Sequence, residues 1–398
     1  MDIRILEVKD IADAARLIAA TGATPSAAVV MAQKAVFRVI RLCRIDNRAV
    51  NLIKQEALSL GAEAAVSHHV SRFTKGFSDV VVMATERQLL SLIQKLSMQP
   101  FGLELTSRHL AEALLNYQRK KFIIRCGRTK VTLGKKPAVM GILNVTPDSF
   151  SDGGFFDTTE RAVERGLEIA SEGADFIDVG GESTRPGSSG VSAAEEKRRV
   201  LPVIQKLTRQ LKIPVSIDTS KPDVALAALE CGATIINDVS ALRVGQGRMA
   251  AVAAKWRVPI ILMHMQGLPR TMQKKPAYED VIGEISDFFT EKIEFALKKG
   301  IRAEQVIIDP GIGFGKTVQH NLEILKNLRE FKVLGYPVAI GTSRKSFIGK
   351  ILKLDHPRDR MGGSIATCVW ACAHGAHLVR VHDVKETVQA MKLLEELT

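Results

Sequence analysis

The sequence predicts an α/β protein in which a smaller N-terminal α/β domain (residues 1–120) precedes a (β/α)8 TIM barrel (residues 121–398). Eight short apolar runs each end in polar residues or glycine, and segments of helix length separate them. This alternation is typical of a barrel of parallel strands, whose functional groups gather on the loops after the strands. A chain of 398 residues is also long enough for one barrel of ~250 residues and a second, smaller domain.

In the N-terminal domain we expect two strands and several helices before a charged hinge at residues 118–121. The expected strands are residues 1–8 and 79–84, and the expected helices are residues 9–20, 48–60, 87–98 and 107–117. Residues 27–42 are apolar, but the pattern leaves their structure open. A strand pair at residues 122–125 and 129–133 should follow the hinge and close the bottom of the barrel.

The barrel helices have recognisable start signals. Residues 157–160, with the sequence DTTE, form a possible capping box, and residues 192–195, SAAE, form another. Pro222 fits the first turn of a helix, where its missing N–H costs nothing.

Composition limits the kind of protein. The net charge is +13, of which +9 falls on residues 1–130, where 20 Lys+Arg meet 11 Asp+Glu. These cations are dispersed, so we interpret them as a solvated basic face and expect no nucleic acid to bind. The sequence has no long uncharged apolar run and no secretory signal, and its five cysteines are scattered. We therefore expect a cytoplasmic protein without membrane contact.

Polar residues close the expected strands and should face one cavity. They are Asn144, Asp178, Asp218, Asn237, His264, Asp309, Lys345, Arg380 and His382. A flat heterocycle rich in N–H donors would satisfy the carboxylates and amides among them. The cations after the seventh and eighth strands fit a phosphate group, since barrels often bind phosphate there.

Two assignments have alternatives. Arg380 and His382 could instead form a structural salt link with Asp383. His264, between two methionines, could equally be a buried core histidine or a ligand contact. Two loops, residues 146–154 and 182–190, have the proline and glycine content expected of lids that exclude water from a reactive site.

The motifs together resemble the dihydropteroate synthase family, the folate-biosynthesis enzymes that sulfonamides inhibit. The resemblance covers about residues 137–394 and rests on eight segments in family order: GILNVTPDSFSDGG, GGESTRPG, SIDTSKP, IIND, LMHMQG, DPGIGFGK, SRKS and RVHDV. It implies a transferase that condenses 6-hydroxymethyl-7,8-dihydropterin diphosphate with 4-aminobenzoate, releasing 7,8-dihydropteroate and diphosphate with the help of Mg2+.

The resemblance also implies roles for individual residues. The pterin would contact Asp218, Asn237, Met263, Asp309, Phe314 and Lys345. The diphosphate would contact Asn144, Arg380 and His382, with Mg2+ near Asn144. The 4-aminobenzoate would contact Phe150, Thr184, Arg185, Pro186 and Ser346. Asp218, Asp152 and Lys345 would serve catalysis, the two carboxylates by stabilising positive charge in an SN1-like step.

The sequence departs from the family in two ways. It has GIGFG where GFGFG is common, which should leave pterin binding intact, and residues 1–120 lie outside the catalytic core and keep an unknown role. The resemblance implies a homodimer. The alternatives are a pterin-binding methyltransferase of the corrinoid-dependent type and a non-catalytic carrier of pterin or nucleic acid.

Overall fold

The computed structural model describes residues 2–72, 74–146, 155–182, 190–267 and 271–397. The chain forms two compact units, residues 1–118 and 119–398, so the units meet two residues before the predicted domain boundary. Within the described ranges, no helix has the length and apolar character needed to cross a membrane.

The N-terminal unit is built around a three-stranded antiparallel sheet in the order β1-β3-β2. Its elements are α1 (Ile11–Ala19), α2 (Pro25–Ala35), β1 (Phe37–Asp46), α3 (Asn47–Ser59), β2 (Glu63–Val66), α4 (His68–Ser71), β3 (Phe77–Thr85), α5 (Glu86–Leu96) and α6 (Leu103–Gln118). Apolar side chains of α3, α5 and α6 bury one face of the sheet. On β1, Phe37 and Val39 stay exposed.

Several predictions for this unit are confirmed, and one is wrong. The expected helices correspond to α1, α3, α5 and α6, and the expected strand at residues 79–84 is the centre of β3. The open stretch at residues 27–42 divides into α2 and the first half of β1. The strand predicted at residues 1–8 is absent from the described residues 2–8. Its alternating side chains Ile3 and Ile5 stay exposed, because a strand forms only where a neighbour pairs with it.

The second unit is the predicted barrel, whose eight strands are all parallel and run in the order β11-β10-β9-β8-β7-β6-β13-β12. A parallel bridge between Ile308 and Val338 closes the ring. The strands are β6 (Ala138–Asn144), β7 (Phe176–Gly180), β8 (Val215–Asp218), β9 (Ile235–Asp238), β10 (Ile260–Met263), β11 (Val306–Asp309), β12 (Ala339–Ile340) and β13 (Leu378–Val381). Their apolar residues fill the core between the strands and the helices.

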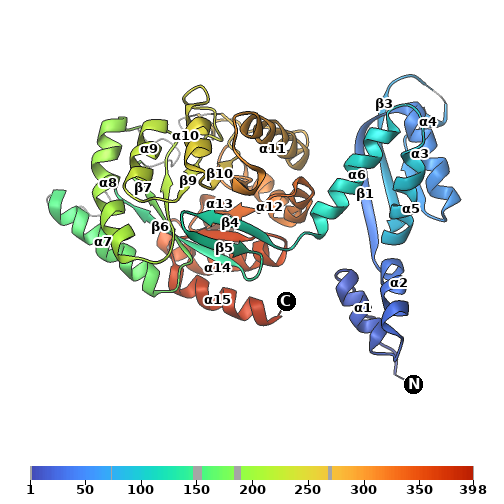
Figure 1. Cartoon of the computed structure of the whole chain (residues 1–398), viewed down its shortest axis with the longest axis horizontal. Helices are drawn as coiled ribbons and strands as arrows, with labels where there is room; N and C mark the ends of the chain where they lie inside the picture. Colours follow the sequence, from blue (N-terminus) through green and yellow to red (C-terminus); the bar gives the residue numbers. More distant parts are fainter. Residues whose placement is uncertain (1, 73, 147–154, 183–189, 268–270, 398) are drawn as a thin grey trace. The chain divides into compact units, whose positions relative to one another are not determined.

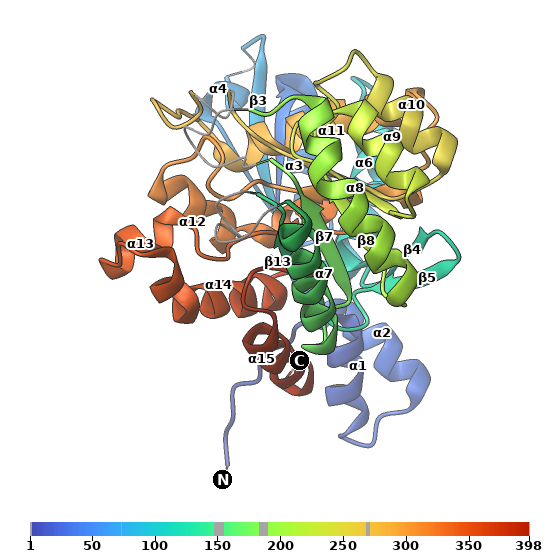
Figure 2. The same cartoon turned by 90° about the vertical axis from the view of Figure 1, so that its left-hand side faces the viewer.

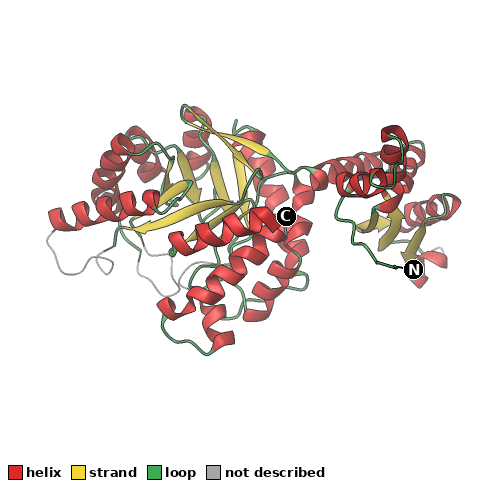
Figure 3. Cartoon of the chain, turned by 90° about the horizontal axis from the view of Figure 1, so that it is seen from below, coloured by secondary structure: helices red, strands yellow, loops and turns green. Residues whose placement is uncertain are grey.

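Helices surround the strands (Figures 1 and 3). They are α7 (Phe155–Ser171), α8 (Ala193–Gln210), α9 (Pro222–Glu230), α10 (Arg248–Trp256), α11 (Val281–Lys298), α12 (Val318–Lys326), α13 (Ser346–Leu352), α14 (Met361–Ala373) and α15 (Val384–Leu397). Figure 2 shows α7 and α8 side by side on the outside of β7. The Ser192 side chain caps α8 and Pro222 begins α9, as predicted, but α7 begins at Phe155, two residues before the expected capping box.

The strand pair after the hinge is a hairpin of β4 (Phe122–Cys126) and β5 (Thr129–Leu133). Phe122, Ile124 and Leu133 are buried in one cluster with residues such as Ala138 and Phe176, which begin barrel strands. The hairpin therefore closes the bottom of the barrel, as predicted, and the opposite mouth is left for the polar strand ends.

Candidate active site at the barrel mouth

One cavity of about 1000 Å³ lies at the C-terminal ends of the strands. All ten predicted site residues that the structure describes line it. They are Asn144, Asp218, Asn237, Met263, Asp309, Phe314, Lys345, Ser346, Arg380 and His382. The predicted residues Phe150, Asp152, Thr184, Arg185 and Pro186 lie outside the described residues.

Arg380, which lines this cavity, connects two carboxylates, Asp178 and Asp218. Its Nε donates to Asp178 Oδ2 at 2.6 Å, and its Nη2 donates to Asp218 Oδ2 at 2.7 Å. Asn237 Nδ2 also donates to Asp178 Oδ2, at 2.9 Å. Side chains from β13, β7, β8 and β9 thus form one hydrogen-bonded group, and Asp178 belongs to it although it does not line the cavity.

Burial changes the pKa of one member of this hydrogen-bonded group, Asp218. It raises the pKa of Asp218 to about 7, a rise that Arg380 opposes and the nearby Asp178 carboxylate increases. The Oδ1 atoms of Asp178 and Asp218 are buried and have no hydrogen-bond partner among the described residues. A buried acceptor without a donor costs about 1–3 kcal/mol, so Asp218, which lines the cavity, is suited to accept an N–H from a ligand.

A glycine-rich turn carries Asp309 and Phe314 into the cavity. Asp309 ends β11, and its Oδ1 accepts from the Gly311 N–H at 2.7 Å. Gly311 has a φ of +70°, and a Cβ there would lie 1.9 Å from the His264 carbonyl oxygen. Only glycine fits this position, because it tolerates both the left-handed backbone and the close approach of the neighbouring loop.

Phe314 forms an apolar wall with methionines from the end of β10 and the loop that follows it. It packs against the buried cluster of Val239, Met263, Met265 and Met272. The Lys345 Nζ lies 4.0 Å from the centre of the Phe314 ring, within the range of a cation–π contact. An ammonium group and an apolar surface therefore meet on one side of the cavity.

His382 and Arg344, which also line the cavity, have distinct partners. His382 Nδ1 lies 3.1 Å from Ser343 Oγ, and the Arg344 guanidinium pairs with Asp383. The carboxylate proposed as the alternative partner of Arg380 and His382 thus binds Arg344. As predicted from ring closure, Asn144 on β6 and Arg380 on β13 are on adjacent strands.

His264, like Asp178, is a strand-end residue that was predicted to face the cavity and does not line it. Its Nδ1 lies 2.9 Å from the buried Lys316 Nζ, and its ring packs edge-on against Phe288 at 4.8 Å. Burial lowers the pKa of His264 to about 2, and the positive charge of Lys316 contributes. The histidine is therefore neutral and belongs to the supporting structure.

Several cavity residues were not predicted. Glu182, Met272, Arg165, Arg358 and Arg360 are among them. Glu182 shares Lys221 with the fully buried Glu196, since the Lys221 Nζ lies 2.5 Å from a carboxylate oxygen of each. Glu182 lies inside the GGESTRPG motif, which was the one available signal for it.

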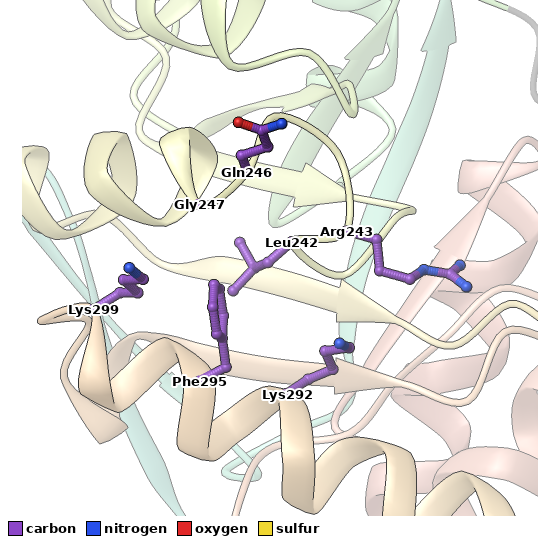
Figure 4. Close-up of a pocket in the computed structure, with 7 residues that line it drawn as sticks. All are labelled: Leu242, Arg243, Gln246, Gly247, Lys292, Phe295 and Lys299. Atoms are coloured by element: carbon purple, nitrogen blue, oxygen red, sulfur yellow. The ribbon is translucent and has the colours of Figure 1, made fainter.

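A second cavity, of about 350 Å³, lies beside α10 and α11 and shares no lining residue with the first (Figure 4). It is lined by Leu242, Arg243, Gln246, Gly247, Lys292, Phe295 and Lys299. None of these described lining residues is acidic. Its composition gives no reason to place the chemistry there.

The main cavity offers only some of the oxygen ligands that a hard cation such as Mg2+ needs. Among the described residues, no group of three or more His, Cys, Asp and Glu could hold a metal ion. Asn144 offers an amide oxygen in the cavity. Mg2+ often takes one or two protein oxygens and completes its shell with substrate phosphates and water, so these residues fit Mg2+ bound together with a phosphorylated ligand.

Comparisons with known proteins agree with this site. The family model described as "Pterin binding enzyme" matches residues 140–382, which span β6 to the end of β13. The dihydropteroate synthase of Synechocystis is 48% identical over 271 residues, covering 68% of this chain and 93% of the relative. A solved structure of Xanthomonas albilineans dihydropteroate synthase with 4-aminobenzoic acid is 46% identical, with a TM-score of 0.66 over 70% of this chain and 98% of that one.

This chain therefore belongs to the dihydropteroate synthase family of pterin-binding enzymes. A further relative also matches the N-terminal unit. The probable bifunctional folylpolyglutamate synthase/dihydropteroate synthase of Halobacterium salinarum is 40% identical over 389 residues. That match covers 98% of this chain and 46% of the relative, so the chain spans about half of that longer protein.

Proposed function

We propose that the chain condenses 6-hydroxymethyl-7,8-dihydropterin diphosphate with 4-aminobenzoate to give 7,8-dihydropteroate and diphosphate. One observation carries the proposal: a single cavity unites N–H acceptors, an apolar wall and cations. A pterin diphosphate presents the matching groups, which are an N–H edge, a flat ring and an anionic tail. The 4-aminobenzoic acid bound to the Xanthomonas relative supports the second substrate.

In this proposal the pterin ring lies between Met263 and Phe314, and its N–H edge donates to Asp218, Asn237 and Asp309. The Asn237 amide nitrogen already donates to Asp178, which leaves its carbonyl oxygen to accept from the ligand. Lys345 would contact the ring from the side of Phe314.

The diphosphate would lie against Asn144, Arg380 and His382, with Mg2+ held by Asn144 and the phosphate oxygens. When bound, Mg2+ would supply Lewis-acid stabilisation of the negative charge on the leaving group. Arg380 can still offer N–H groups to a phosphate, because a guanidinium has five donors and two are engaged with carboxylates.

The reaction would be SN1-like. The bond between the pterin methylene carbon and the diphosphate oxygen breaks with its electron pair on oxygen, and positive charge develops on the methylene. The 4-aminobenzoate nitrogen then attacks that carbon and loses one proton. Asp218 and Asp152 would stabilise the cation electrostatically, and Phe150, Thr184, Arg185, Pro186 and Ser346 would form the 4-aminobenzoate pocket.

We also propose that the enzyme acts as a homodimer. Apolar side chains are exposed on α13 and α14, namely Ile351, Leu352, Met361 and Trp370. Exposed apolar side chains that lie together are typical of an interface between subunits, and α13 contacts α14. Sedimentation equilibrium would find a monomer at all concentrations if the proposal is wrong.

Formation of dihydropteroate by the purified chain tests the function directly. Asp152→Ala should reduce turnover strongly and leave binding of the pterin diphosphate intact; normal turnover would remove Asp152 from the mechanism. The corrinoid-dependent methyltransferase alternative has no use for the diphosphate. Calorimetric titration with the pterin diphosphate and with 6-hydroxymethylpterin, each with and without Mg2+, separates the two: equal affinity for both ligands would favour the alternative.

A further inference from the structure

Lys316 is a buried lysine that the proposed chemistry does not use. Lys316 is only 3% exposed, and its Nζ lies 2.9 Å from His264 Nδ1 and 3.1 Å from the Phe314 carbonyl oxygen. Both partners are uncharged, because His264 is neutral. An ammonium group is costly to bury and is retained where its charge or its donors serve a purpose.

The surroundings of Lys316 connect two loops at the barrel mouth. His264 follows β10, and Lys316 ends the glycine-rich turn after β11. A Cβ on Gly315 would lie 2.5 Å from the Gln266 carbonyl oxygen, so the two backbones are in direct contact. Tyr278 OH donates to the Gly315 carbonyl oxygen at 3.0 Å and so holds the same turn from the other side.

The hydrogen-bond geometry defines the state of the pair. A protonated lysine is only a donor, so His264 Nδ1 accepts when Lys316 carries its charge, and the proton of the neutral ring is then on Nε2. The second bond of Lys316, to the Phe314 carbonyl, fixes the residue whose ring forms the cavity wall. Lys316 thus acts on Phe314 through the backbone, without touching the cavity.

Lys316 also acts on Asp309 through its charge. Burial lowers the pKa of Lys316 to about 7, and the attraction of the Asp309 carboxylate opposes this fall. Because both residues are buried, their attraction is stronger than it would be at the surface when Lys316 is protonated. Burial raises the pKa of Asp309, and Lys316 and Lys345 are two of the cations that oppose this rise. Lys316 therefore favours the ionised form of the carboxylate.

We propose that Lys316 is a positioning residue of the pterin subsite, which holds Phe314 in place from beneath the cavity and, when protonated, attracts the Asp309 carboxylate. The proposal rests on the proposed function, since it assumes that Asp309 and Phe314 bind the pterin ring. It predicts that loss of Lys316 harms recognition of the ring and leaves recognition of the diphosphate unchanged.

The test uses the full chain and two separate probes, 6-hydroxymethylpterin and inorganic diphosphate with Mg2+, in calorimetric titrations. Lys316→Met keeps the length of the side chain and removes its charge and donors. It should weaken binding of 6-hydroxymethylpterin at least tenfold and change binding of diphosphate less than twofold. Lys326→Met, at the exposed end of α12, is the matched control and should change neither.

Two further variants separate charge from hydrogen bonding and from folding. Lys316→Gln keeps a donor without the charge and should lose less pterin affinity than Lys316→Met. Asp309→Asn should weaken pterin binding, and adding Lys316→Met to it should cost less than Lys316→Met costs alone, because the carboxylate through which Lys316 acts is gone.

The outcomes are distinguishable. If the unmodified chain, or the chain with Lys326→Met, fails to bind 6-hydroxymethylpterin, the proposed function fails before Lys316 is in question. If that binding is normal and Asp309→Asn weakens it, the subsite stands. The role of Lys316 would be overturned if Lys316→Met lost equal affinity for pterin and diphosphate, or lost no affinity for pterin. It would also be overturned if the fold losses in pterin affinity of Lys316→Met and Asp309→Asn simply multiplied in the double variant. If Lys316→Met does not fold, the same comparison with Lys316→Gln decides.

Discussion

Arg380→Met should leave two buried carboxylates without their shared cation. The side chain of Asp178 is fully buried and that of Asp218 is 9% exposed, and Arg380 binds both at 2.6 and 2.7 Å. Removal of one partner from a buried ion pair costs about 3–5 kcal/mol. We expect a loss of this size in the free energy of unfolding of the barrel unit at pH 8.

The loss should depend on pH in a defined direction. Burial raises the pKa of Asp218 to about 7 even with Arg380 present, and without Arg380 it must rise further. Between the unfolded value of about 3.9 and the folded value, the folded chain binds a proton that the unfolded chain has released. Up to about pH 7 both chains lose stability alike as pH rises, and above pH 7 only the variant continues to lose it, so the difference from the unmodified chain should be larger at pH 8 than at pH 5.

Urea unfolding followed by tryptophan fluorescence measures this effect. Both tryptophans, Trp256 and Trp370, belong to the barrel unit, so the signal reports on it alone. Adding Asp218→Asn to Arg380→Met should restore part of the stability, and Arg248→Met, which removes an exposed arginine paired with Asp223, is the control. An equal loss at both pH values would mean that Arg380 acts through packing, and the electrostatic reasoning would be refuted.

Three more predictions follow from the cavity. Asp309→Ala and Lys345→Ala should each weaken binding of 6-hydroxymethylpterin by roughly 10–100-fold, as expected for lost hydrogen bonds to charged groups; unchanged affinity in both would remove the proposed pose. Since Asp218 must be ionised to accept an N–H, pterin affinity should fall by up to about tenfold per pH unit below pH 7, and Asp218→Asn should flatten this profile in the same titrations. Gly311→Ala should destabilise the barrel by at least about 2 kcal/mol in urea unfolding, because its Cβ would meet a backbone carbonyl at 1.9 Å, whereas Gly362→Ala, with open space around it, should not.

The positions of the strand ends around the barrel mouth were predictable, because closure of the barrel determines which strands are neighbours. Each strand signals its end by a polar residue or glycine, and closure of eight strands places the first beside the last. That reasoning placed Asn144 next to Arg380. This reasoning predicts where backbone positions lie, because the alternation of strands and helices determines those positions.

The partners of long side chains were not predictable in the same way. Arg380 and Asp178 are separated by 202 residues, and the guanidinium reaches a strand that is not its direct neighbour. The position of His264 was left open because its methionine neighbours fit a core or a ligand wall equally well. Its burial depends on Lys316 and Phe288, which come from other elements.

In the proposed reaction, the donors of Arg380 are shared between two carboxylates and the diphosphate. Its Nε and one Nη2 donor serve Asp178 and Asp218, so it can give a diphosphate only its remaining donors. Asn144, His382 and the exposed Arg358 at the same cavity would then make more of the contacts with the diphosphate. As the diphosphate leaves with its negative charge, the Asp218 carboxylate, still held by Arg380, would remain to stabilise the cation on the pterin methylene.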